Sequence, residues 1–150
     1  MKKKLLIIII ILLVIAFAGY FVLNNSSNNI IKVDSANFNM PEGYHIDKNQ
    51  SNNTDVAITN GSNVIHISTL DGKYATPFIK SYVNYSTTNG QFVSNSTLKI
   101  NNILVYRFEN SNASSIHEWF VYKNKVYTIY GWGNNPNFDG IAFELIESIK

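Results

Sequence analysis

The residues best suited to bind a ligand lie within residues 127–138, whose sequence is YTIYGWGNNPNF. Trp132 stands between two glycines at the end of an expected strand, and Tyr130 faces the same side because side chains alternate along a strand. Two aromatic rings beside asparagine amides could form a flat surface for a sugar ring or a partner side chain. We therefore name Tyr130 and Trp132 as candidate ligand-binding residues. In the alternative interpretation, Trp132 packs into the core beneath a C-terminal helix.

Three histidines and one serine are the other candidates for chemistry. His45, His66 and His117 form no short-spaced pair, so a zinc site requires that they meet in the folded chain. Ser62 lies in a Gly-Ser-Asn sequence that is typical of a hairpin turn, whereas a nucleophilic serine needs an oriented histidine beside it. The sequence contains no phosphate-binding glycine loop. We predict no catalytic residue, no metal site and no cofactor.

Asparagine is unusually frequent, with twenty-two residues, all of them after position 23. Eight of these asparagines occupy Asn-x-Ser/Thr triplets, the acceptor sequence for N-glycosylation. The eight possible glycosylation sites are Asn24, Asn25, Asn49, Asn52, Asn60, Asn84, Asn95 and Asn112. Two explanations stay open, namely glycosylation of an outward-facing domain and a coding bias toward asparagine.

The segment that begins at Leu5 and ends at Leu23 contains no charge and is rich in leucine and isoleucine. It is long enough to cross the hydrocarbon core of a membrane as a helix, since each residue adds about 1.5 Å. Residues 1–4 carry three lysines, so the positive-inside rule places the N-terminus in the cytoplasm and the rest outside. We therefore expect a single-pass signal-anchor in contact with membrane lipid. The alternatives are cleavage after Ala18, which would release a secreted protein, and a pilin-like subunit.

The remaining charge is close to balanced. After position 23 the chain has nine Lys and Arg and all ten acidic residues, so this part carries a formal charge of −1. A basic surface for nucleic acid is therefore not expected. The chain has no cysteine, which excludes a disulfide and a cysteine-linked lipid. We expect residues 24–35 to be a polar stalk and residues 36–150 to form one extracytoplasmic domain.

Turn residues divide the expected domain into hairpins. Asn-Gly at 60–61 separates two β-rich runs at 55–59 and 64–70, which is a strong hairpin signal. Asn-Asn at 101–102 predicts a second hairpin, and Lys-Asn-Lys at 123–125 predicts a third. Both faces of the strand over 116–122 carry aromatic residues, so we expect this strand to be central in the sheet, with both faces covered.

Two segments change to helical periodicity. The run that starts with Thr76 and Pro77 predicts a helix over 77–88. Near the C-terminus, apolar residues at i, i+3, i+4, i+7 and i+11 from Phe138 predict an amphipathic helix, with Asp139 available as its cap. Six or seven antiparallel strands with two helices give an α+β domain.

The order of elements resembles the PsbP-like family, an α/β/α sandwich. The resemblance covers residues 36–150 and rests on FNMPEGY at 38–44, on the strand containing Trp119 with the hairpin after it, and on LIESIK at 145–150. These are packing and turn motifs, so the resemblance implies the fold and, for small anchored members, no assigned activity. No stretch matches a functional motif of PsbP or of the Ran-binding member of the fold, so neither activity transfers.

These patterns lead to three hypotheses about function. The first is a non-enzymatic, membrane-tethered domain that binds a protein or a wall component outside the cell as an accessory factor. The second is a module that binds a saccharide or another small molecule through Tyr130 and Trp132. The third is a hydrolytic or metal enzyme.

Overall fold

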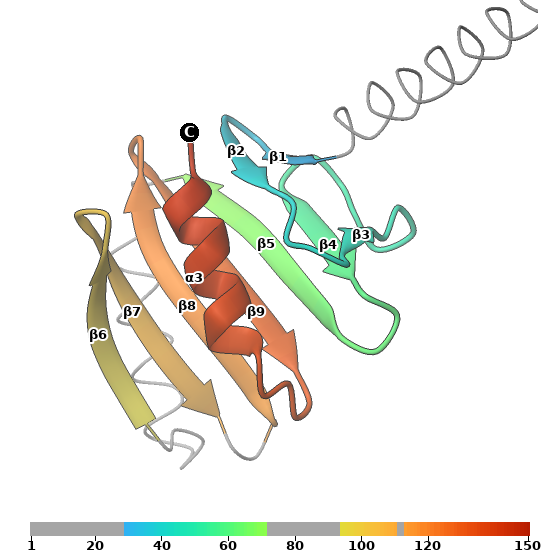
Figure 1. The fold of residues 1–150 in the computed structure, drawn as a ribbon. Helices are drawn as coiled ribbons and strands as arrows, with labels where there is room; N and C mark the ends of the chain where they lie inside the picture. Colours follow the sequence, from blue (N-terminus) through green and yellow to red (C-terminus); the bar gives the residue numbers. More distant parts are fainter. Residues whose placement is uncertain (1–28, 72–93, 111–112) are drawn as a thin grey trace, which may run out of the picture. The chain divides into compact units, whose positions relative to one another are not determined.

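The computed structural model describes residues 29–71, 94–110 and 113–150 (Figure 1). The chain divides into two compact units, Met1–Ile30 and Ile31–Lys150. The sheets and the helix α3 belong to the second unit, apart from Ile30, the first residue of β1. Within the described ranges, no helix has the length and the apolar character that crossing a bilayer requires.

Several predictions fall on residues outside these ranges. They are the basic tip at 1–4, the transmembrane segment at 5–23, the helix at 77–88, and the possible glycosylation sites Asn24, Asn25, Asn84 and Asn112.

Seven strands form one sheet in which every neighbouring pair is antiparallel. The strands are β3 (His45–Ile46), β4 (Asp55–Thr59), β5 (Val64–Asp71), β6 (Ser94–Ile100), β7 (Ile103–Asn110), β8 (Ser115–Tyr122) and β9 (Lys125–Trp132). Their order across the sheet is β3-β4-β5-β9-β8-β7-β6 (Figure 1). The prediction that β8 is a central strand is therefore confirmed.

The three predicted hairpins are present, and the backbone conformation of their turns explains why asparagine occurs in them. Asn101 and Asn102 both have positive φ, at 44° and 69°, and so do Lys123 and Asn124, at 46° and 61°. Two consecutive residues with positive φ match the right-handed twist of the strands, and asparagine adopts this conformation at low cost. The β4–β5 turn is longer, and the side chain of Asn60 accepts hydrogen bonds from the amides of Ser62 and Asn63.

The C-terminal helix α3 (Phe138–Ser148) lies across one face of the sheet (Figure 1). Its buried residues are Phe138, Ala142, Leu145 and Ile146, which follow the predicted apolar stripe. The predicted cap is wrong. Asn137 precedes the helix, and Asp139 lies inside its first turn, where its carboxylate binds Arg107.

A small two-stranded sheet of β1 (Ile30–Val33) and β2 (Ala36–Asn39) packs into the same core as α3. Ile31 and Val33 are fully buried, so the polar stalk expected at 24–35 does not extend to residue 35. The backbones of Asn37 and Lys150 exchange two hydrogen bonds, which tie β2 to the end of α3.

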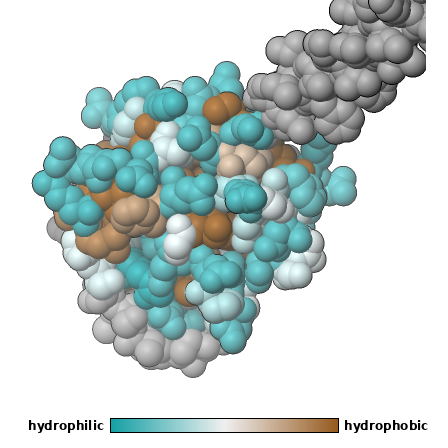
Figure 2. Space-filling model, viewed as in Figure 1, coloured by the Kyte–Doolittle hydropathy of each residue, from teal (hydrophilic) through white to brown (hydrophobic). Residues whose placement is uncertain are grey.

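The two faces of the sheet are chemically different. The face toward α3 carries the main core, with Ile65, Ile67, Phe120 and Ile129 among its fully buried side chains. Side chains that alternate with these point to the opposite face, where Phe108, Trp119 and Val126 form a second cluster. Figure 2 shows the α3 side, on which hydrophilic residues predominate and hydrophobic patches are small. The aromatic candidates of the sequence lie on the face opposite α3.

Candidate ligand-binding site

A row of stacked rings crosses three central strands on the face opposite α3. His66 on β5 is paired with Tyr130 on β9, and Tyr130 is paired with His117 on β8. The ring centroids are 4.9 Å apart for His66 and Tyr130, with an interplanar angle of 20°, and 5.4 Å for Tyr130 and His117, at 12°. Cross-strand neighbours stack in this way because their Cβ atoms are only about 5 Å apart.

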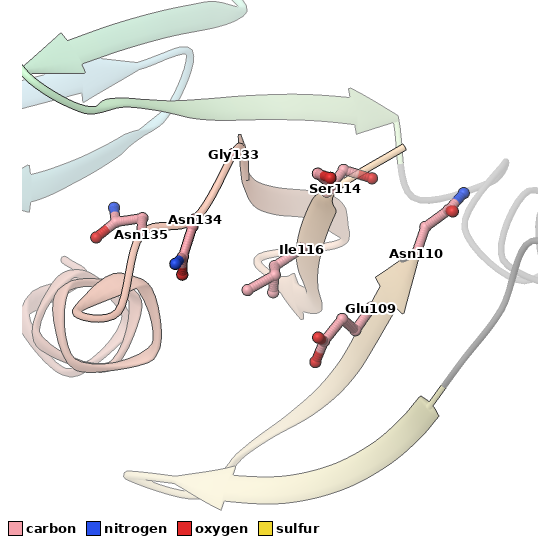
Figure 3. A pocket seen from close by; sticks show the side chains of 8 residues that line it. Glu109, Asn110, Ser114, Ile116, Gly133, Asn134 and Asn135 are labelled. Atoms are coloured by element: carbon pink, nitrogen blue, oxygen red, sulfur yellow. The ribbon is translucent and has the colours of Figure 1, made fainter. Parts of the chain in front are cut away.

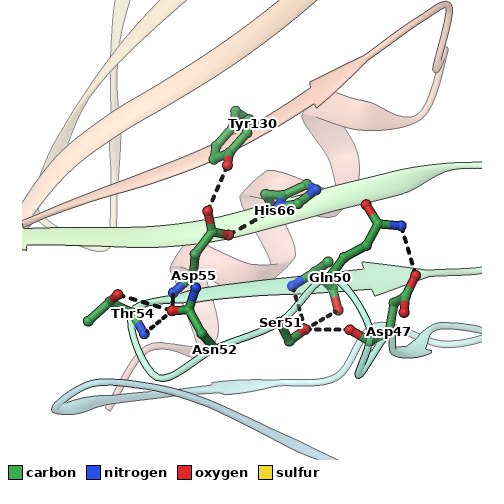
Figure 4. A network of polar contacts seen from close by, with 9 residues as sticks. Asp47, Gln50, Ser51, Asn52, Thr54, Asp55, His66 and Tyr130 are labelled. Carbon is green, nitrogen blue, oxygen red and sulfur yellow. Dashed lines mark hydrogen bonds and ion pairs between the residues drawn. The ribbon is translucent and has the colours of Figure 1, made fainter.

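Asp55 on β4 anchors the row at one end (Figure 4). One carboxylate oxygen accepts a hydrogen bond from the hydroxyl of Tyr130 at 2.9 Å, and the other lies 3.0 Å from Nδ1 of His66. A carboxylate accepts hydrogen bonds, so this contact assigns the proton to Nδ1 and leaves Nε2 of a neutral His66 as an acceptor. Asp55 is itself fixed because its backbone amide donates to the side chain of Asn52 at 3.0 Å.

Trp132 completes the site as its exposed member. Its side chain is 54% exposed, whereas Trp119 is only 3% exposed. The Trp132 ring stands edge-on to His66, with centroids 5.4 Å apart, and to Tyr130, at 5.1 Å. The alternative that placed Trp132 in the core beneath α3 is therefore wrong. Gly131, one residue earlier, is the position that faces α3, with its hypothetical Cβ only 3.3 Å from the ring of Phe138.

Burial shifts two pKa values in this row. Burial raises the pKa of Tyr130, and its hydrogen bond to Asp55 and the charge of Asp55 act in the same direction. Burial lowers the pKa of His117 to about 4. At neutral pH the row therefore consists of a protonated Tyr130 hydroxyl and a neutral His117 imidazole, and its negative charge belongs to Asp55.

The three histidines do not converge. His45 is exposed on the edge strand β3, while His66 and His117 are separated by the ring of Tyr130. Over the residues that the structure describes, no group of three His, Asp or Glu side chains is arranged to hold a metal ion. Ser62 lies at the exposed tip of the β4–β5 hairpin.

A pocket of about 220 Å³ lies at one end of the sheet, beside the loop that contains Gly133, Asn134 and Asn135 (Figure 3). Its walls include the carboxylate of Glu109, Ser115 and the amide side chains of Asn134 and Asn135. Ser115 is the cross-strand partner of Trp132, so the pocket lies at the same end of the sheet as this residue. Glu109 and Ile116, which are paired and line the pocket, belong to the α3 face, whereas the Trp132 ring lies on the opposite face. Such amide, hydroxyl and carboxylate groups can bond the hydroxyls of a ligand.

The described asparagines of the glycosylation triplets have a structural role of their own. Asn52 accepts hydrogen bonds from both the amide and the hydroxyl of Thr54, and Asn60 caps the β4–β5 turn. Asn49 is exposed, next to the polar loop around Asp47. Of Asn95 only the backbone, in β6, is described. Glycosylation at these positions stays a prediction.

Sequence reasoning identified Tyr130 and Trp132 but missed Asp55 and His66. In the sequence, His66 suggests only a metal ligand, and Asp55 is the first residue of the strand expected over 55–59. The pairing of β4 with β5 is what brings the two residues together, because Ala57 opposite His66 places Asp55 diagonally beside the imidazole. That pairing depends on the exact length of the turn, which the sequence left open.

No protein-family model matches this chain, and no curated protein matches it. A crystal structure from Bacteroides thetaiotaomicron VPI-5482 is similar at 12% identity and a TM-score of 0.52; the match covers 82% of this chain and 48% of that one. This chain thus spans about half of that protein's length. The solution structure of cyanobacterial PsbP (CyanoP) from Synechocystis sp. PCC 6803 matches at 12% identity and a TM-score of 0.46, covering 82% and 92%.

The likeness to the Bacteroides structure concerns the fold alone. An α+β domain with a seven-stranded antiparallel sheet and a C-terminal helix agrees with the predicted fold class. The narrower assignment to the PsbP-like family stays a prediction.

Proposed function

We propose that this chain is a membrane-tethered, non-enzymatic domain that binds a wall component outside the cytoplasm by stacking a sugar ring on Trp132. The tether is the apolar segment at 5–23, and the PsbP-like assignment belongs to the same proposal. The observation that carries the proposal is the exposure of Trp132 at 54%, while Tyr130 and His66 hold its ring edge-on.

The arrangement suits binding because the aromatic surface is ordered before a ligand arrives. Asp55 fixes Tyr130 and His66 through hydrogen bonds of 2.9 and 3.0 Å, and these two rings support Trp132. A rigid aromatic ring loses little conformational entropy when a ligand stacks on it.

The proposal is tested by titrating the full chain, in detergent micelles, with a panel of wall-derived glycans while recording tryptophan fluorescence. We expect the exposed Trp132 to change its emission on binding and the buried Trp119 to contribute a constant background. Isothermal titration calorimetry, which needs no tryptophan at position 132, measures the variants. Trp132→Ala should abolish binding, and Trp132→Phe should retain part of it, because a smaller ring still stacks. Binding that is unchanged in Trp132→Ala would overturn the proposal.

A hydrolytic enzyme is the second candidate, favoured by one observation. The contact of 3.0 Å between Asp55 and Nδ1 of His66 is the arrangement in which a carboxylate orients an imidazole as a general base. An assay of generic ester and glycoside substrates tests this candidate. Turnover that disappears in His66→Gln, with an unchanged melting temperature, would establish the enzymatic function in place of the binding one.

A further inference from the structure

Glu118 is a buried acid in the layer between the sheet and α3. It lies on β8 with 2% of its surface exposed, and its neighbours Phe120 and Ile129 belong to the main core. One of its carboxyl oxygens, Oε2, is buried and has no hydrogen-bond partner. A buried carboxylate is stable only if a cation or hydrogen-bond donors compensate its charge.

The nearest cation is already committed to other carboxylates. Arg107 on β7 is the cross-strand partner of Glu118. Its Nε and Nη2 donate to both oxygens of Asp139 in α3, at 2.8 and 3.2 Å, and its Nη1 donates to Glu109 at 3.1 Å. Three carboxyl groups therefore surround one guanidinium, and protonation of one carboxyl brings the cluster closer to neutrality.

The electrostatics select Glu118 as the group that keeps a proton. Burial and, to a smaller extent, the negative charge of Asp139 raise the pKa of Glu118 to about 7, while Arg107 acts in the opposite direction. The two partners of Arg107 are far more exposed, with Glu109 at 43% and Asp139 at 59% of their side-chain surface. Water can stabilise their ionised forms, whereas Glu118 has no such access.

We propose that the proton on Glu118 controls how firmly the first turn of α3 docks on the sheet. A protonated Glu118 presents a neutral group to the carboxylate of Asp139. An ionised Glu118 repels that carboxylate and competes for Arg107, the contact that holds the start of the helix. The charged groups facing Glu118 are Arg107 and Glu109 from β7 and Asp139 from α3, while its β9 neighbour, Ile129, is uncharged.

Hydrogen exchange of the full chain in detergent micelles tests this inference between pH 4.5 and 8.5, after correction for intrinsic exchange rates. The pKa of Glu118 is higher when α3 is docked than when α3 is open. Below the docked pKa, each rise of one pH unit therefore makes the opening of α3 about tenfold more frequent. We therefore expect the protection of amides in α3 to fall by on the order of a hundredfold between pH 5 and 7 and to level off above pH 7. Amides of β9 serve as the internal reference.

Two variants and a control separate this mechanism from general instability. Glu118→Gln should remove the pH dependence of α3 protection, and the exposed Glu147→Gln should retain it. Asp139→Asn should lower the pH at which protection levels off, because it removes a charge that raises the pKa. A wild-type profile without pH dependence, an unchanged slope in Glu118→Gln, or an unmoved plateau in Asp139→Asn would each overturn the inference.

Discussion

Asp55 organises three strands through one side chain. It sits on β4, contacts His66 on β5 and reaches Tyr130 on β9, which is two strands away. Hydrogen bonds to an ionised acceptor contribute about 1.5–3 kcal/mol each, and both donors here are at least partly buried. The order of the aromatic site therefore depends on a charged residue that itself exposes 29% of its side chain.

Asp55→Ala should lower the free energy of unfolding by about 3 kcal/mol or more, because His66 and Tyr130 both lose their acceptor. Urea denaturation followed by circular dichroism measures this change. Asp47→Ala is the matched control, since Asp47 bonds Asn49 and Gln50 in an exposed loop, and it should cost less than about 1 kcal/mol. Equal losses in the two variants would contradict this role of Asp55.

The two tryptophans provide a second prediction at the level of residues. Trp132→Ala should change the free energy of unfolding by no more than about 1 kcal/mol, because 54% of the side chain already contacts water. Trp119→Ala should cost about 3–5 kcal/mol, because it empties a buried site on the same face. Thermal denaturation compares the two, and a large loss in Trp132→Ala would mean that Trp132 is structural.

At the scale of elements, the contact between α3 and β9 depends on a residue without a side chain. A Cβ at Gly131 would lie 3.2 Å from the carbonyl oxygen of Val64 and 3.3 Å from the ring of Phe138. Such distances are shorter than ordinary van der Waals contact, so Phe138 packs as it does only because position 131 is glycine. The same glycine separates Tyr130 from Trp132.

Gly131→Ala should destabilise the protein by about 1–3 kcal/mol, since the added methyl group displaces α3 or the β5–β9 pairing. Gly140→Ala is the control, because nothing lies within 4 Å of a Cβ at this position in α3. It should raise the stability by about 0.5–1 kcal/mol through helix propensity. Chemical denaturation distinguishes the two, and a neutral Gly131→Ala would contradict the close packing.

At the scale of the whole molecule, the buried Glu118 and the partly buried His117 oppose each other in the pH dependence of stability. The pKa of Glu118 is raised from 4.5 to about 7, so the unfolded state binds fewer protons and stability falls as the pH rises through this range. The pKa of His117 is lowered from 6.5 to about 4, so stability rises with pH over that interval. Each slope is about 1.4 kcal/mol per pH unit.

These opposite slopes should nearly cancel in the wild-type protein between about pH 4.5 and 6.5. Glu118→Gln should uncover rising stability over this interval, and His117→Asn should uncover falling stability. Denaturation at a series of pH values measures both slopes. Parallel profiles for the two variants would show that these groups do not dominate the pH dependence.

The expected topology is also a property of the whole chain. With the N-terminus in the cytoplasm, a protease added to intact cells should remove a tag placed after Lys150. The same tag on a cytoplasmic protein is the control and should survive until the cells are broken. A protected tag on this chain would contradict the outward orientation and the wall ligand together.

Local sequence patterns were sufficient to predict the strands β4 to β9 and the helix α3. Asn101 and Asn102 predict a tight turn because they tolerate positive φ, and the spacing of apolar residues from Phe138 predicts α3 because one stripe of a helix must be buried. These signals depend on neighbours in sequence. The start of the domain was misjudged because Ile31 and Val33 form a strand too short to stand out from a polar linker.

The sequence by itself determined the strands β4 to β9, their hairpin turns, the C-terminal helix and the fact that Tyr130 and Trp132 share a face. Only the tertiary structure decided which face α3 covers, and hence that Trp132 is exposed and Glu118 is buried. The physical reason is that side chains alternate between the two faces of a strand. Which face is buried depends on contacts with elements that are distant in the sequence. The environments of Asp55 and Glu118, and with them their chemistry, arise from that choice.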